Sequence, residues 1–358
     1  MSPNVLGEEF GDAIGEDDPL DLVFWRIAVR DSNSGGSIWT RMSHSNREQS
    51  RSSSQGGAAP RRSPREEDRM GSPESSMQSK IQKALSMSLR PVAILVSEEA
   101  PAGAARFQEG KWGCVMMMFT AVATQGRCAA FDRSTYGCWG GGVGLGFGNA
   151  YETFPGGVEC FVRFLSTGNA GWEHGRRLAA TLPQGRGFSE RFLEGERYIA
   201  SPALARAFVE QLPMREVPSR YVVFKPLADV EPERETPVTV VFPVNAHQLS
   251  ALVVLANAGR PGNENVAIPF AASCQTIGIL PMREADRPFP RAVVGHTDIS
   301  ARGYVRKTLG PEIVTFAAPW ALFCEMEGLA AESFLSLSTW GVLAELTEVR
   351  KTSAEGSR

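Results

Sequence analysis

Apolar side chains repeat with helical and strand periods from residue 79 onward. Ile81, Leu85 and Leu89 recur every four residues, as on one face of a helix. Capping residues predict where other helices begin. Ser201 is followed by Pro202, and this order is typical of an N-cap residue and a proline in the first turn of a helix. We predict helices over residues 79–89, 111–125 and 202–212 and between Asn245 and Gly259, with partial helix over 316–339. We predict strands over residues 92–96, 128–131, 221–224, 238–242, 265–270 and 292–295.

Strands that alternate with helices predict an α/β or α+β fold, with a mixed sheet and flanking helices. We expect one such domain over residues 77–345. The strands after Pro91 and Pro237 begin alike, so two loosely related halves, 77–215 and 216–345, are possible. Residues 346–358 are expected to form a flexible tail.

Residues 1–76 differ in composition from the rest of the chain. They are rich in Arg, Ser and Gly, with little apolar surface to offset chain entropy, so we predict a disordered extension. One apolar stretch, residues 20–29, interrupts it, and we expect no specific role for it. An alternative is that the natural start is Met70 or Met77.

Charge and hydropathy limit the class of protein. There are 37 Lys and Arg against 40 Asp and Glu, a net charge of −3 with a pI near 6.0. That balance argues against nucleic acid or a membrane surface as partner. No apolar run is long enough to span a membrane, and the start is not a secretory signal. We therefore expect a cytoplasmic protein whose candidate partners are a small molecule and a second copy of the chain in a homo-oligomer.

Six cysteines are candidate ligands or nucleophiles. No pair has the Cys-x-x-Cys spacing of zinc or thioredoxin-type sites, so the fold would have to assemble any metal site from distant positions. Cys114 stands at a predicted helix start, where a thiolate is favoured, Cys138 adjoins a glycine-rich run, and Cys274 is expected in a loop after a strand. Three converging thiolates at Cys114, Cys138 and Cys274 would hold an iron–sulfur cluster or a soft metal. The alternatives are ordinary core cysteines and a reactive thiol.

Glycine occupies every second position of residues 140–148. In an extended strand, Gly140, Gly142, Gly144 and Gly146 would share one face that carries no side chains. Such a face suits a flat ligand, a phosphate or a closely packed backbone. The run is neither a dinucleotide-binding fingerprint nor a phosphate-binding P-loop. We predict either a ligand-cradling strand or a site of tight packing.

Arg302, Lys225 and His296 are further candidates. Asp298 and Arg302 have the spacing of a helix N-cap with an i,i+4 ion pair, but Arg302 would also suit an anionic ligand. Lys225 follows a predicted strand and is either an anion contact or a solvated lysine. His296, at a strand end beside Asp298, is the best candidate for a general base, although no motif pairs it with a nucleophile.

Several blocks together resemble one family. They comprise residues 112–116, 136–148, 194–198, 221–227, 248–252, 274–278 and 298–302. Over about residues 77–340 the chain resembles the uncharacterised ArCR family, domain of unknown function 169. That family occurs in bacteria and archaea and has no firmly assigned reaction, so the resemblance implies relatives and no chemistry. Cys114, Cys138 and Cys274 all fall inside these blocks.

Three functions follow as hypotheses. The first is a redox or ligand-binding protein in which Cys114, Cys138 and Cys274 carry an iron–sulfur cluster or soft metal beside the glycine-rich strand. The second is a metal-free enzyme or sensor that binds a small anionic metabolite, with Lys225 and Arg302 as contacts. The third is a structural or interaction protein without a ligand.

Overall fold

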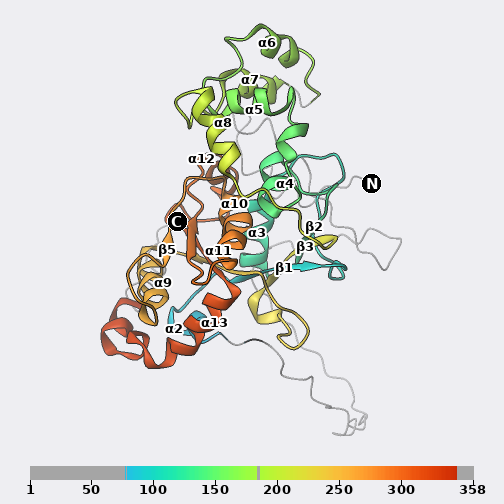
Figure 1. The fold of residues 1–358 in the computed structure, drawn as a ribbon. Coiled ribbons are helices and arrows are strands. Elements are labelled where there is room, and N and C mark those ends of the chain that lie inside the picture. Colours follow the sequence, from blue (N-terminus) through green and yellow to red (C-terminus); the bar gives the residue numbers. More distant parts are fainter. Residues whose placement is uncertain (1–76, 78, 184–185, 345–358) are drawn as a thin grey trace, which may run out of the picture.

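A seven-stranded mixed sheet forms the centre of the protein (Figure 1). The computed structural model describes residues 77, 79–183 and 186–344. The strands are β1 Val92–Ser97, β2 Ala129–Phe131, β3 Tyr221–Pro226, β4 Thr239–Val244, β5 Val266–Ala267, β6 Ala292–Gly295 and β7 Val314–Pro319. Their order is β2-β3-β1-β4-β7-β6-β5; the β5–β6 pair is parallel and the others are antiparallel. The predicted mixed sheet with flanking helices is confirmed.

The helices surround this sheet. They are α2 Lys80–Ala84, α3 Val115–Gln125, α4 Trp139–Leu145, α5 Gly157–Leu165, α6 Glu173–Ala179, α7 Arg186–Glu194, α8 Pro202–Gln211, α9 Ala246–Ala258, α10 Ser273–Ile277, α11 Ile279–Ala285, α12 Ile299–Val305 and α13 Trp320–Leu329. Short 3₁₀ turns are η3 Ala150–Thr153, η4 Leu227–Asp229, η5 Ala330–Glu332 and η6 Phe334–Ser336. No helix in the described part of the chain has the length and apolar character needed to cross a membrane. The predicted tails, residues 1–76 and 346–358, lie outside the described residues.

Local capping chemistry explains where several helices begin and end. Asn245 and Gln248 form a reciprocal capping box at the start of α9, as the sequence predicts. The Ser201 side chain accepts from the backbone N–H of Leu204 at the start of α8. Gly126 closes α3 in the left-handed conformation, with φ of 73°.

Several predicted elements are shorter in the structure. The helix predicted over residues 79–89 ends at Ala84. The strand predicted over 265–270 is only two residues long. The partial helix predicted in the apolar stretch 316–339 is confirmed as α13, although the stretch begins inside strand β7. A buried strand and a buried helix are both continuously apolar, so periodicity does not separate them.

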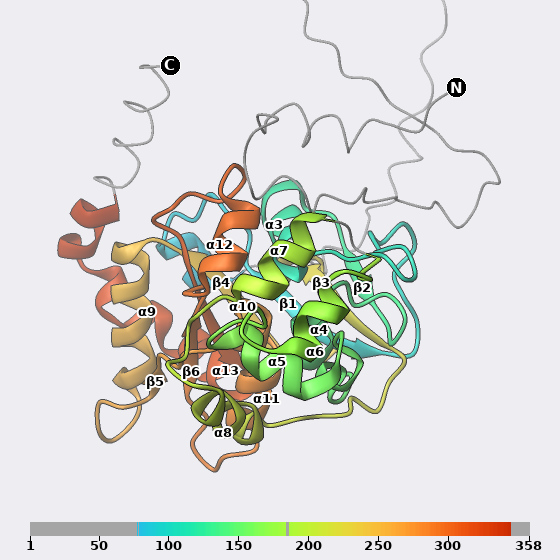
Figure 2. The same cartoon turned by 90° about the horizontal axis from the view of Figure 1, so that it is seen from above.

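The two faces of the sheet carry separate apolar cores, because side chains alternate faces along each strand. One core gathers residues such as Ile94 and Phe224 with α3, α4 and α10, and it extends into α5, α7 and α8. The other gathers Val240 and Phe316 with α2, α9 and α13. Figures 1 and 2 show α5, α6, α7 and α8 stacked beyond α3, α4 and α10 on the first face. We call these four helices the helical cap.

Candidate functional site

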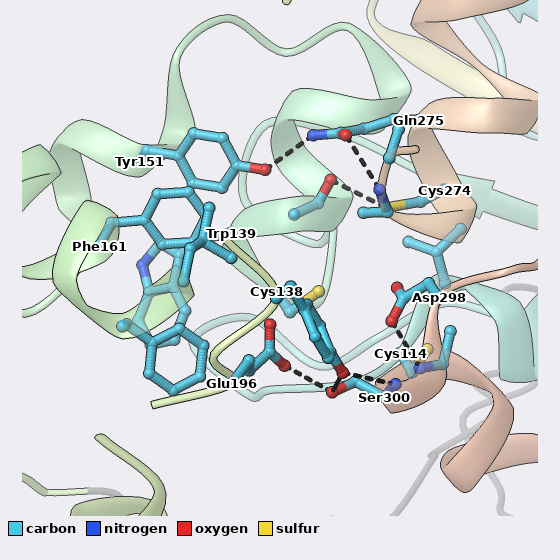
Figure 3. A pocket seen from close by; sticks show the side chains of 18 of the residues that line it. Cys114, Cys138, Trp139, Tyr151, Phe161, Glu196, Cys274, Gln275, Asp298 and Ser300 are labelled. Carbon is cyan, nitrogen blue, oxygen red and sulfur yellow. Dashed lines mark hydrogen bonds between the residues drawn. The ribbon is translucent and has the colours of Figure 1, made fainter. Parts of the chain in front are cut away.

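A cavity lies between the helical cap and the helices that cover the first face of the sheet. It encloses about 150 Å³. A cavity of this size holds about one six-membered ring. Its wall is mainly apolar and rich in aromatic residues, some of which are labelled in Figure 3. The aromatic residues are Trp112, Trp139, Tyr151, Phe154, Phe161, Phe164, Phe188, Tyr198, Phe208, Phe270 and Tyr304.

The aromatic wall is packed ring against ring. Tyr151 and Phe161 are stacked with centroids 3.7 Å apart, and Trp139 meets Phe154 edge-on at 4.9 Å. Gln275 donates from its side-chain nitrogen to the Tyr151 hydroxyl at 2.7 Å. Such contacts fix ring orientation, so the cavity has a formed shape before any ligand binds.

Cys114, Cys138 and Cys274 line this one cavity, although they come from distant parts of the sequence. Cys114 is the N-cap of α3, Cys138 is the N-cap of α4, and Cys274 lies in the first turn of α10. The expectation that Cys274 lies in a loop is therefore wrong. The Cys274 thiol donates to the carbonyl of Gly140 at 3.0 Å, and the Cys138 sulfur accepts from the backbone N–H of Gly141 at 3.3 Å.

Burial favours the protonated form of these three side chains. It raises the pKa of the Cys138 thiol to about 11, and it also raises the pKa of Cys114 and of Cys274 well above the ordinary value. Burial thus opposes the thiolate expected at Cys114 from its helix start, and it outweighs the backbone N–H groups of Met116 and Met117 that favour the charged form. Within the described residues, no three Cys, His, Asp or Glu side chains are arranged to hold a metal ion. As arranged, the thiols do not fit a resident metal or cluster.

A hydrogen-bonded polar group forms another part of the wall. Ser300 donates to Glu196 at 2.5 Å, and Arg191 contacts the same carboxylate oxygen at 3.3 Å. Arg191 also donates to the Tyr304 hydroxyl at 2.6 Å, and the Tyr198 hydroxyl lies 3.0 Å from that of Ser300. Every side chain in this network therefore has a partner, which holds the Glu196 carboxylate in place.

Backbone geometry places Glu196 in the wall. The chain turns at Gly195, where φ is +75° and a Cβ would lie only 2.7 Å from the Cα of Gly168. Glycine is required there both for the left-handed conformation and for the close crossing. The backbone N–H of Glu196 then donates to the carbonyl of Phe164 in α5 at 2.7 Å. This crossing ties Glu196 to the helical cap.

Two carboxyl groups give the cavity an acidic character. Burial, together with the neighbouring Asp298, raises the pKa of Glu196 to about 7 against the opposing effects of Ser300 and Arg191. Burial also raises the pKa of Asp298, although backbone N–H groups of Ala301 and Ser273 partly stabilise its charge. Asp298 caps α12, as predicted.

The glycine-rich run is a helix, so the prediction of a strand is wrong. Residues 139–145 form α4, which Cys138 and Gly146 cap at its two ends. A Cβ on Gly144 would lie 2.8 Å from the backbone carbon of Cys274, and one on Gly142 would lie 2.6 Å from the Cβ of Ala150. The glycines therefore permit close packing of α4 on α10 and η3. Among the predicted glycines Gly140 lines the cavity, and Gly142, Gly144 and Gly146 do not.

His296 has a partner that the sequence does not reveal. Its Nδ1 lies 3.2 Å from the hydroxyl of Ser273, and both side chains are buried. Burial lowers the pKa of His296 to about 4. Neither residue lines the cavity, so the arrangement supports the start of α10 next to Cys274. The proposed role of His296 as a general base stays a prediction.

The predicted anion contacts, Lys225 and Arg302, do not line the cavity. Lys225, which lies on strand β3, forms an ion pair with Glu235 at 2.7 Å. Arg302 donates to the carbonyls of Pro311 and Ile313 at 2.9 and 3.1 Å. Asp298 accepts from backbone N–H groups, so the ion pair expected between Asp298 and Arg302 is replaced by these contacts.

Sequence reasoning missed Glu196, Arg191 and the aromatic wall. Glu196 lies in one of the family-like blocks, residues 194–198, and it follows the constrained Gly195. The aromatic residues of 151–208 are spread over η3, α5, α7 and α8, most of which the sequence pattern did not predict as helices. A high density of aromatic residues in that stretch was the available signal.

The comparisons with known proteins yield a family but no activity. The family model described as uncharacterised ArCR, domain of unknown function 169, matches residues 80–328, well over half of the chain. The chain belongs to this family, which confirms the resemblance. No curated protein and no solved structure matches the chain.

Proposed function

We propose that this member of an uncharacterised family binds a small organic cation whose apolar body is about the size of one ring. The observation that carries the proposal is the position of two partly buried carboxyl groups, Glu196 and Asp298, in the wall of a cavity rich in aromatic residues. Aromatic faces and carboxylates are the groups with which proteins recognise ammonium ions. The ligand would place its apolar part among the rings and its charge near the carboxylates.

The balance of charge favours a cation over an anion. Arg191 is the one basic residue that lines the cavity among the residues described. It offsets one carboxylate, so one negative charge remains uncompensated when Glu196 and Asp298 are both ionised. The Glu196 contacts within the described chain are made through Oε1, which leaves Oε2 available to a ligand. A bound cation would relieve the repulsion that raises the pKa of Glu196.

Two other functions expected from the sequence have less support. An iron–sulfur cluster or soft metal on Cys114, Cys138 and Cys274 stays a prediction, which iron and sulfide analysis of the anaerobically purified protein would test. The thiols share a cavity wall, but they do not fit a resident metal as arranged. An anionic metabolite bound by Lys225 and Arg302 also stays a prediction, and these residues have other partners.

The test compares three ligands of similar size and different charge. Benzylammonium, toluene and benzoate are titrated into the full chain at pH 8, where Glu196 is ionised, and heats of binding are measured. We expect benzylammonium to bind about tenfold tighter than toluene, a difference of roughly 1.4 kcal/mol. We expect benzoate to bind most weakly. Equal affinities for benzylammonium and toluene, or tighter binding of benzoate, would contradict the proposal.

A pair of charge-neutralising variants assigns the preference to a residue. Glu196→Gln removes the carboxylate and should abolish the preference for benzylammonium while leaving toluene binding unchanged. Glu190→Gln is the matched control, because Glu190 carries the same charge on the exposed side of α7, paired with Arg186. The control should bind all three ligands as the unaltered chain does.

A further inference from the structure

Two of the cavity thiols face one small gap beside α4. A Cβ built on Gly140 would lie 3.8 Å from the sulfur of Cys274 and 3.9 Å from the sulfur of Cys138. Both sulfurs therefore border the space that the missing Gly140 side chain leaves open. The two cysteines come from different helices, α4 and α10, whose close packing depends on Gly144. Figure 3 shows the two side chains on the same side of the cavity.

The surroundings of this gap restrict what two thiols can bind. Cys274 is 6% exposed, and the groups nearby are apolar rings and two carboxyl groups. A monovalent metal ion held by two thiolates would add a net negative charge to this acidic cavity, which is costly. A ligand that leaves the charge unchanged avoids that cost. Such a ligand forms bonds to the two sulfur atoms, and each thiol proton leaves as part of a neutral molecule.

We propose that Cys138 and Cys274 form a dithiol site for a trivalent arsenical that carries a small apolar group. An arsenical with two hydroxyl groups on arsenic meets this requirement. Two As–O bonds break, two As–S bonds form, and each thiol proton leaves on a hydroxide as water. Arsenic stays trivalent, so no oxidant or reductant is needed. The apolar group would lie against the aromatic wall.

This site goes beyond the proposed function and does not depend on it. Cation binding rests on Glu196 and Asp298, whereas the dithiol site rests on Cys138, Cys274 and the gap at Gly140. Glu196→Gln should leave arsenical binding intact. The failure of one proposal is therefore distinguishable from the failure of the other.

Phenylarsine oxide is the probe for the test. The full chain is treated with one equivalent of the probe, and its intact mass and its thiol content after denaturation are measured. We expect one phenylarsenic group per chain, the loss of two titratable thiols and reversal by excess ethanedithiol. Cys138→Ser and Cys274→Ser should each lose the adduct. Cys324→Ser is the control, because that exposed cysteine lies outside the cavity, and it should keep the adduct.

Gly140→Ala tests the site without removing a cysteine. The added methyl group would sit at ordinary contact distance from both sulfurs, so the chain should fold and the gap should be filled. We expect the affinity for phenylarsine oxide to fall on the order of tenfold, with an unchanged thermal midpoint or a higher one. If either serine variant fails to fold, Gly140→Ala decides the matter. Absence of an adduct, its persistence in Cys138→Ser or Cys274→Ser, or unchanged affinity in Gly140→Ala would overturn the proposal.

Discussion

The two faces of the sheet are built differently. The face covered by α2, α9 and α13 carries a closed apolar core in which Phe242, Phe316 and Phe323 are fully buried. The opposite face is also apolar next to the strands, but farther out it encloses the cavity with its thiols and carboxyl groups. One face of the sheet thus carries a packed apolar core that stabilises the fold. The other face carries a cavity in which carboxyl groups are removed from water without an equal number of positive charges.

This difference indicates that the cavity face is the binding region. On the closed face nearly every side chain is explained by burial alone. On the cavity face, burial works against the charges of Glu196 and Asp298, whose pKa values it raises. Groups held at such a cost are typical of binding sites, and they lie in the cavity wall.

The largest expected effect is on the closed core. Phe242→Ala should lower the free energy of unfolding by about 3–5 kcal/mol, because it leaves a cavity in packed surroundings. Phe270 is the matched residue on the cavity face. It is 50% exposed, so Phe270→Ala should cost much less. Urea denaturation of both variants measures the difference, and similar losses would contradict the contrast between the faces.

The next effect is a pH dependence that comes from Glu196. Its pKa of about 7 in the folded chain exceeds its ordinary value of 4.5, so the folded state binds more protons between these values. The contribution of Glu196 to stability is therefore present below pH 4.5 and is lost as pH rises to 7, on the order of 3 kcal/mol in total. Urea denaturation from pH 4.5 to 8 measures it.

His296 acts in the opposite direction over part of that range. Its pKa is lowered from 6.5 to about 4, so its contribution is present above pH 6.5 and is lost as pH falls to 4. The Glu196 effect must therefore be taken as the difference between the unaltered chain and Glu196→Gln. Parallel pH profiles for the two proteins would mean that Glu196 titrates normally.

We expect a smaller effect on stability when either of two glycines of α4 is replaced by alanine, with opposite directions at the two positions. Gly144→Ala should lower the free energy of unfolding by about 1–3 kcal/mol, because its Cβ would meet the backbone of α10. Gly140→Ala meets no such obstacle and should be neutral or stabilising by about 0.5–1 kcal/mol. Thermal unfolding of both variants tests whether α4 packs tightly on one side and borders open space on the other.

The sequence predicts the sheet better than the site. Apolar runs such as residues 92–96 predict strands because each is short and bounded by a proline or a turn. Caps such as Asn245 and Gly126 predict helix ends, because their chemistry is local. Periodicity does not predict the glycine-rich helix α4, because glycine at every second position also suits a strand. The close packing of α4 on α10, which leaves no room for a side chain at Gly144, has no local signal in the sequence.

The sequence indicates three cysteines and Gly140 of the cavity wall but not most of the other residues that line it. Cys114, Cys138 and Cys274 could be selected because each stands at the boundary of a predicted element or of the glycine-rich run. Their protonated state could not be predicted, because it depends on how deeply the tertiary structure buries them. Glu196 was missed because its importance comes from a backbone crossing at Gly195 and from contact with Ser300, which is distant in sequence.

The most direct test of the central claim is a crystal structure of the full chain with benzylammonium bound at pH 8. We expect the ring between the aromatic walls of the cavity and the ammonium group within hydrogen-bonding distance of the Glu196 carboxylate. A ligand outside the cavity, or one inside it with its ammonium group directed away from both Glu196 and Asp298, would contradict the account.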